Sequence, residues 1–129
     1  MQSSKKQQYD YEVTLVRVVD GDTIVVSIDL GFGISWQTSL RLFGFDTPER
    51  GEAGHDEAIV ALKALLPPKF LVTTVKDNDK YGRYLASIPG VAESMIRDGW
   101  AVPYSGGKKM PAAEAEKVRA LAQQLVARR

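Results

Sequence analysis

Residues 9–28 read YDYEVTLVRVVDGDTIVVSI and contain two runs typical of β-strands, the first of which alternates apolar and polar side chains. The apolar residues that share one parity in the first run are Tyr9, Tyr11, Val13, Leu15 and Val19. This spacing predicts a strand with one buried face. The second run, residues 23–28, is rich in β-branched side chains, and the Asp20-Gly21 dipeptide before it is typical of a hairpin turn. The stretch therefore predicts two antiparallel strands.

Outward from this hairpin the sequence predicts three more strands, over residues 36–43, 70–75 and 84–88. Apolar residues at helical spacing predict three helices, over residues 58–66, over residues 91–97 and from Pro111 onward. An apolar stripe on the last helix is expected to pack on the barrel: Val118, Leu121, Ala122 and Leu125. Five strands with a helix between the third and fourth predict an α+β, mainly β, fold. This is a five-stranded barrel of the oligonucleotide/oligosaccharide-binding (OB) type with three helices.

The composition fits one globular domain, since 129 residues with 44% apolar and 26% charged side chains can build one core. The longest apolar run, residues 58–62, is far shorter than the roughly 20 residues of a membrane helix, so no membrane partner is expected. The chain has no cysteine, which excludes disulfides and thiolate metal sites. Its single histidine, His55, argues against an imidazole zinc site and is expected to be solvated in a polar loop.

The charge is nearly balanced, with 17 Lys and Arg against 16 Asp and Glu. Any contact with nucleic acid must therefore use local basic groups, and clustered acids could hold a hard cation. The first ten residues are polar, so we expect residues 1–8 to form a disordered lead before a domain over residues 9–129. The lead has no apolar segment typical of a secretory signal, which predicts a cytoplasmic location unless a signal was removed beforehand.

Three short segments concentrate charge beside turns: VDGDT at 19–23, RLFGFDTPE at 41–49 and DKYGRYLA at 79–86. A turn explains Asp20-Gly21, but it has no need of the second carboxylate, Asp22, at the mouth of an apolar strand. Arg41 lies between two leucines, and a buried guanidinium must be paired or face a ligand. An internal salt bridge from Arg41 to Asp46 or Glu49 and a ligand-facing role are both open.

Taken together, the three segments resemble the staphylococcal (thermonuclease-type) nuclease family. That family has Asp-Gly-Asp-Thr, then Arg-Leu-x-x-x-Asp-Thr-Pro-Glu, then Asp-x-Tyr-Gly-Arg-x-Leu-Ala, and all three occur here in this order. The resemblance runs from about Val13 to Tyr104 and loosely through the last helix. It implies an OB-like barrel that carries a calcium-dependent phosphodiesterase.

The resemblance also implies a role for particular residues. The implied Ca²⁺ ligands are Asp22, Asp46 and the backbone carbonyl of Thr47, which are hard oxygen donors. The implied catalytic residues are Glu49, which would orient or deprotonate the attacking water, and Arg41 and Arg83, which would bind the phosphate. The implied substrate-binding residues are Lys80, Tyr81 and Tyr104, for which ordinary packing of the two tyrosines is the alternative.

The function implied by the resemblance is hydrolysis of DNA and RNA with low sequence specificity, leaving 3′-phosphate ends, by a monomer. A nuclease acting inside a cell would fit a phage or mobile element. The alternative is a non-catalytic OB module that binds single-stranded nucleic acid. Such a module has no need of two metal-binding aspartates, a glutamate and two arginines together, so the sequence favours the enzyme.

Overall fold

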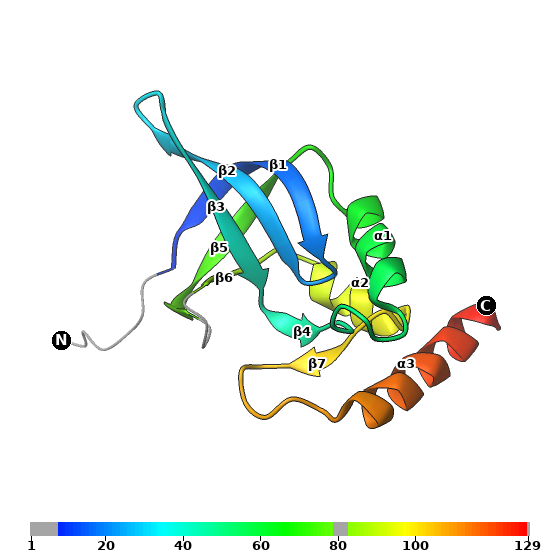
Figure 1. Ribbon diagram of the computed structural model, residues 1–129. Helices are drawn as coiled ribbons and strands as arrows, with labels where there is room; N and C mark the ends of the chain where they lie inside the picture. The colour runs from blue at the N-terminus through cyan, green and yellow to red at the C-terminus, as the bar shows by residue number, and fades with distance from the viewer. Residues whose placement is uncertain (1–7, 79–82, 129) are drawn as a thin grey trace.

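The computed structural model describes residues 8–78 and 83–128 (Figure 1). The predicted lead, residues 1–8, lies outside the described residues except for its last position. In chain order the elements are β1 (Asp10–Asp20), β2 (Thr23–Gly31), β3 (Ile34–Leu42), β4 (Gly44–Asp46), α1 (His55–Leu65), β5 (Lys69–Asn78), β6 (Tyr84–Ser87), α2 (Val91–Arg97), β7 (Val102–Tyr104) and α3 (Ala112–Ala127).

Five of these strands close into a barrel in the order β1-β2-β3-β6-β5, which confirms the predicted fold. All neighbours in the barrel are antiparallel except β3 and β6, which run parallel. The alternation predicted for β1 breaks at a bulge between Leu15 and Arg17. An extra residue in one strand reverses the side-chain parity beyond it. Val18 rather than Val19 therefore packs against the core.

The core fills the barrel and continues between the barrel and the helices. Inside the barrel it is built from the β-branched and leucine side chains that face inward, among them Val13, Ile24, Val26, Leu40, Leu42 and Val72. Phe45, Leu62 and Met95 extend the same cluster toward α1 and α2 and are at most 1% exposed. The two helices lie on one side of the barrel, so the strand ends on that side are held in place by packing (Figure 1).

A small second sheet, β4 with β7, was not predicted, because the sequence analysis ended the third strand at residue 43 and expected no strand between residues 88 and 111. The chain leaves β3 through Gly44, whose φ of +101° favours glycine, and then buries Phe45. β7 pairs antiparallel with this segment, with Tyr104 opposite Gly44 and Val102 opposite Asp46. The connection that follows β7 begins beside Gly44 and returns toward residues 46–49, where Lys109 contacts Asp46 and Glu49.

The predicted packing face of α3 is wrong at three of its four residues, and the fourth, Ala122, is half-buried. Val118, Leu121 and Leu125 are 38%, 60% and 52% exposed, whereas Ala115 and Arg119 are buried. α3 contacts α2 and β7 rather than the barrel, and it approaches at Gly99, where a Cβ would lie 2.7 Å from the Arg119 carbonyl oxygen. The backbone contact at Gly99 thus selects a different stripe of the helix. Within the described part of the chain, no helix combines the length and apolar character needed to cross a membrane.

Candidate active site

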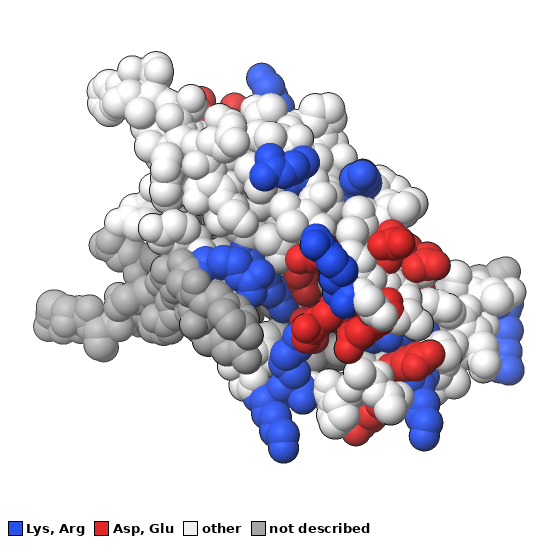
Figure 2. Space-filling view, viewed as in Figure 1, with Lys and Arg blue, Asp and Glu red and all other residues white. Residues whose placement is uncertain are grey.

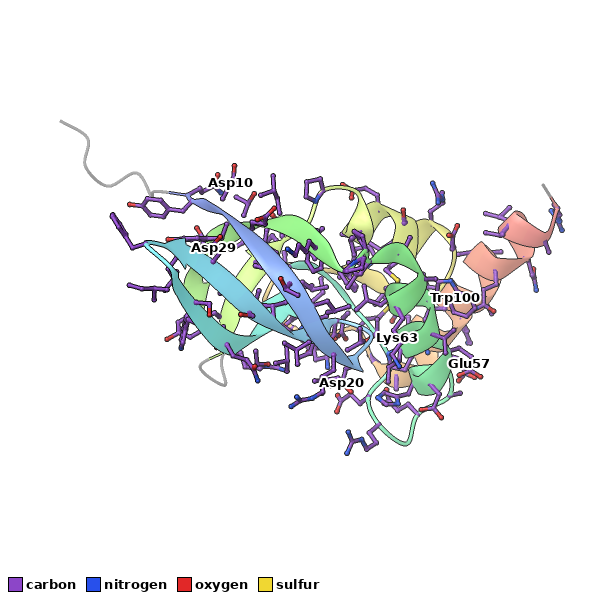
Figure 3. All side chains as sticks on the ribbon, turned by 90° about the horizontal axis from the view of Figure 1, so that it is seen from above. Asp10, Asp20, Asp29, Glu57, Lys63 and Trp100 are labelled. Carbon is purple, nitrogen blue, oxygen red and sulfur yellow. The ribbon has the colours of Figure 1, made fainter. Side chains whose placement is uncertain are left out.

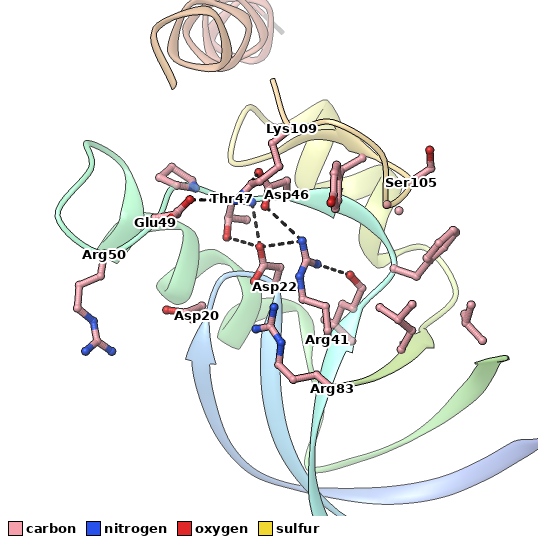
Figure 4. A pocket seen from close by; sticks show the side chains of 18 residues that line it. Asp20, Asp22, Arg41, Asp46, Thr47, Glu49, Arg50, Arg83, Ser105 and Lys109 are labelled. Carbon is pink, nitrogen blue, oxygen red and sulfur yellow. Dashed lines mark hydrogen bonds and ion pairs between the residues drawn. The ribbon is translucent and has the colours of Figure 1, made fainter. Parts of the chain in front are cut away.

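Charged residues of the first two segments and Arg83 of the third line one pocket near the end of β1 that carries Asp20, away from Asp10 and Asp29 (Figure 3). Its walls are the end of β1 and the turn before β2, the segment from β3 to the loop after β4, Val75 of β5, the start of β6, and the end of β7 with the β7–α3 connection (Figure 4). The charged lining residues are Asp20, Asp22, Arg41, Asp46, Glu49, Arg50, Arg83 and Lys109. Near the centre of this face a group of acidic atoms lies with Lys and Arg atoms around it, and other acidic atoms lie apart from it (Figure 2).

The turn between β1 and β2 is fitted closely against the rest of the site. A Cβ on Gly21 would lie 2.7 Å from Ala58 Cβ and 2.8 Å from Thr47 Cγ2, so no side chain fits there without a shift. This close approach places the next residue, Asp22, against Thr47. The glycine predicted as a hairpin residue therefore also sets the position of the carboxylate.

Asp22 is 7% exposed, and its carboxylate accepts three hydrogen bonds. Its Oδ2 accepts hydrogen bonds from the backbone N–H and the hydroxyl of Thr47, both at 3.1 Å. Its Oδ1 accepts a hydrogen bond from the Thr23 hydroxyl at 3.0 Å. Donors from two segments thus hold this carboxylate in one orientation, which offsets the cost of its burial.

Arg41 joins the two buried aspartates. Its Nη2 lies 3.2 Å from Asp46 Oδ1 and 3.4 Å from Asp22 Oδ2, while Nη1 donates to the carbonyl oxygens of Leu42 and Phe45. Of the open alternatives, the internal salt bridge to Asp46 is present, and none to Glu49 is found in the described structure. Because one nitrogen reaches both aspartates, the two carboxylates face each other across a short gap (Figure 4).

Lys109 is the residue that the sequence analysis missed. Its Nζ lies 3.0 Å from Glu49 Oε2 and 3.4 Å from Asp46 Oδ2. Burial works against the Lys109 ammonium, but the hydrogen bond to Glu49 and the charge of Asp46 raise its pKa on balance. Burial also raises the pKa of Asp46, against the charges of Lys109 and Arg41. Only the basic character of residues 108–109 could have suggested this contact, since Lys109 is 60 positions from Glu49.

The remaining predicted site residues lie at the rim or outside the described chain. Arg83 Nη1 lies 3.4 Å from the Thr23 hydroxyl, in the same pocket. The Tyr104 ring centre is 5.7 Å from the Arg41 guanidinium carbon, a distance at which an aromatic face attracts a cation. Lys80 and Tyr81 lie outside the described residues.

Comparison with known proteins gives the family. The family model described as staphylococcal nuclease homologue matches residues 39–128, more than half of the chain. The chain belongs to the staphylococcal nuclease family. It is similar to the micrococcal nuclease of Shigella flexneri, with 32% identity over 113 residues, covering 75% of this chain and 62% of that protein. It is also similar to protein ParB of Escherichia coli, with 34% identity over 74 residues, covering 57% of this chain and 39% of that protein. The chain thus spans less than two thirds of each relative.

In this member of the staphylococcal nuclease family, the acidic residues of the site could hold a hard cation if solvent or substrate supplies further oxygen ligands. Among the described residues, no three His, Cys, Asp or Glu side chains converge as a ready-made metal cluster. Asp22 and Asp46 nevertheless meet on one guanidinium nitrogen, with the Thr47 backbone against Asp22. Two carboxylates with water and phosphate oxygens are a donor set that suits Mg²⁺ or Ca²⁺. The residues present therefore fit a divalent cation whose coordination is completed by a phosphate.

His55 is buried, contrary to the expectation that it is solvated. It is 7% exposed at the first position of α1, with Nε2 2.9 Å from Asp20 Oδ1 and Nδ1 3.0 Å from Asp56 Oδ1. Hydrogen bonds to Asp20 and then to Asp56 raise the pKa of His55 against the effect of burial. No local pattern revealed this pairing, since Asp20 and His55 are 35 positions apart. Asp20 is thereby fixed beside the pocket.

Protonated His55 should stabilise the fold in a defined pH range. In the folded protein the pKa of His55 is raised above 6.5. Its contribution to the free energy of unfolding is therefore complete below pH 6.5 and is lost as the pH rises through the folded pKa. We expect His55→Gln to lower the free energy of unfolding by about 1 kcal/mol at low pH and by less at high pH. Urea unfolding of both proteins between about pH 5.5 and pH 8.5 measures this difference. Because His55 is the single histidine, NMR titration of its imidazole gives the pKa directly. A difference that stays constant across the range would contradict the prediction.

Proposed function

We propose that the protein is a calcium-dependent nuclease that hydrolyses phosphodiester bonds of DNA and RNA with low sequence specificity. One observation carries the proposal: Asp22, Arg41, Asp46, Glu49 and Arg83 come from three distant segments and line a single pocket. A barrel that only binds single strands needs basic and aromatic side chains, but it has no use for buried carboxylates beside a guanidinium. Family membership supports the same chemistry.

The cation in this proposal is held by Asp22, Asp46 and the Thr47 carbonyl oxygen. When bound, Ca²⁺ supplies positive charge that neutralises a phosphate oxygen. The hydrogen bonds from Thr47 and Thr23 keep Asp22 oriented for this task, because they leave its carboxylate a single orientation. Arg41 keeps the two aspartates together and prevents their mutual repulsion from opening the pocket.

The other charged groups act on the phosphate and the attacking water. Glu49 is 68% exposed on its side chain, so water reaches its carboxylate, which accepts the proton of the attacking water. Arg41 and Arg83 stabilise the charge that grows on the phosphate, and Arg83 assists departure of the 5′-oxygen, leaving 3′-phosphate ends. Lys80, Tyr81 and Tyr104 bind the nucleotide. One copy of the chain supplies all the described residues of the pocket, and the proposed enzyme is a monomer.

The test is cleavage of plasmid DNA and of labelled single-stranded DNA and RNA oligonucleotides with Ca²⁺ or with EDTA. We expect nicking and oligonucleotide cleavage with Ca²⁺ and none with EDTA, and end-group analysis should find 3′-phosphates. Binding without cleavage would instead support the non-catalytic single-strand-binding module. Cleavage that persists in EDTA would contradict the calcium requirement.

A further inference from the structure

We propose that Lys109 is a tethered cation of this site that competes with the divalent ion for Asp46, and that its ammonium leaves Asp46 and Glu49 when the ion binds. This inference rests on the proposed function, because it concerns the same cation. It assigns a role to Lys109, which lies in the β7–α3 connection and outside the three charged segments.

The first step is the occupancy of the Asp46 oxygens. Oδ1 lies 3.2 Å from Arg41 Nη2, and Oδ2 lies 3.4 Å from Lys109 Nζ. Each oxygen of this carboxylate therefore already faces a cationic side chain. A divalent ion that takes Asp46 as a ligand must share an oxygen with one of these two groups or displace it.

The second step is the difference in how firmly the two cations are held. The Arg41 side chain is 8% exposed, and besides the two aspartates it is bound to the carbonyl oxygens of Leu42 and Phe45. The Lys109 side chain is 35% exposed, and its polar contacts with described residues are the two ion pairs with Asp46 and Glu49. Moving Arg41 would break buried hydrogen bonds, whereas the Lys109 ammonium can be resolvated when it leaves. Lys109 is therefore the group that yields.

The third step is the connection that carries Lys109. It contains Gly106, with φ of +97°, and Gly107, and a Cβ at either glycine would meet nothing within 4 Å. Residues 105–108 are exposed, so movement of the connection would break little packing. The ion pairs of Lys109 thus hold an otherwise loosely packed connection against the loop after β4, and ion binding should release it.

The test measures Ca²⁺ binding alone, by titration calorimetry on the full chain without nucleic acid. Lys109→Met removes the competing charge and should bind Ca²⁺ roughly five- to thirty-fold more tightly than the wild type, as expected for one unit charge a few ångströms from the ion. Lys108→Met, an equal change of charge at the exposed neighbouring position, should change the affinity less than about two-fold. Lys109→Arg retains the charge and should stay close to the wild type.

A second measurement tests the release itself. Amide hydrogen exchange of residues 105–109 should become faster when Ca²⁺ is added to the wild type, and it should already be fast in Lys109→Met. If Lys109→Met binds Ca²⁺ no more tightly than Lys108→Met, or if Ca²⁺ slows exchange in this connection, the role of Lys109 is refuted while the cation site stands. If the wild type and all variants bind no Ca²⁺, both the cation site and the inference fail.

Discussion

Replacement of Glu49 by glutamine is expected to lower kcat by about 10²–10⁴-fold at saturating Ca²⁺. Glutamine keeps the size of the side chain, and it leaves the hydrogen bond from the Glu49 backbone N–H to Glu52 Oε1, at 2.7 Å, in place. The loss is therefore that of a proton acceptor rather than of the loop. The measurement is single-turnover cleavage of a defined oligonucleotide, together with urea unfolding, which should change by less than about 0.5 kcal/mol.

The matched control for this variant is Glu57→Gln, which removes an equal charge from the exposed face of α1. Its kcat should stay within about two-fold of the wild type, because an exposed charge outside the pocket is screened by salt. Glu49 also pairs with Lys109, so Glu49→Gln should loosen that contact. If Glu49→Gln cleaves as fast as Glu57→Gln, Glu49 does not accept the proton, and its assignment as a catalytic residue is wrong.

The parts of the fold and site that sequence could predict are those fixed by local patterns. Alternating side chains predicted β1, a run of β-branched residues predicted β2, and the turn at Gly21 followed from its residue types. Asp22 and Arg41 stood out because a charged side chain in an apolar strand requires a partner. Contact between Asp22 and Arg41 could be expected once the two strands were paired, because Thr23, the neighbour of Asp22, is opposite Arg41 in the register of β2 and β3.

The parts that sequence could not predict depend on contacts between residues far apart in the chain. Burial of His55 depends on Asp20, and the position of Lys109 depends on β7 pairing with β4. Neither β4 nor β7 is longer than three residues, so neither carries enough alternation to be recognised. The packing face of α3 was mistaken for a similar reason: the close approach at Gly99, rather than the apolar stripe, sets its orientation.

The second large effect is expected for Arg41→Met, which should lower the free energy of unfolding by about 3–5 kcal/mol at neutral pH without divalent cations. The variant leaves the Asp22 carboxylate, 10% exposed, and the Asp46 carboxylate, 14% exposed, facing each other without the guanidinium that joins them. Arg97→Met is the control, because it removes an arginine whose ion pair with Asp98 lies at the surface, and it should cost less than about 1 kcal/mol. Urea unfolding of both variants measures the difference.

Two conditions should restore the stability of Arg41→Met, and both follow from the repulsion between its aspartates. Ca²⁺ should raise the unfolding free energy of the variant more than that of the wild type, since a bound cation replaces the missing charge and stabilises only the folded state. Lower pH should also help. Burial raises the folded pKa of Asp46 above 3.8, and loss of Arg41 raises it further, so the folded variant takes up a proton before the unfolded chain does. Its deficit should therefore shrink as pH falls from about 7 toward 5. If the deficit is the same with Ca²⁺ and at both pH values, Asp22 and Asp46 do not act together as a cation site, and the proposed chemistry loses the pair of acids on which it depends.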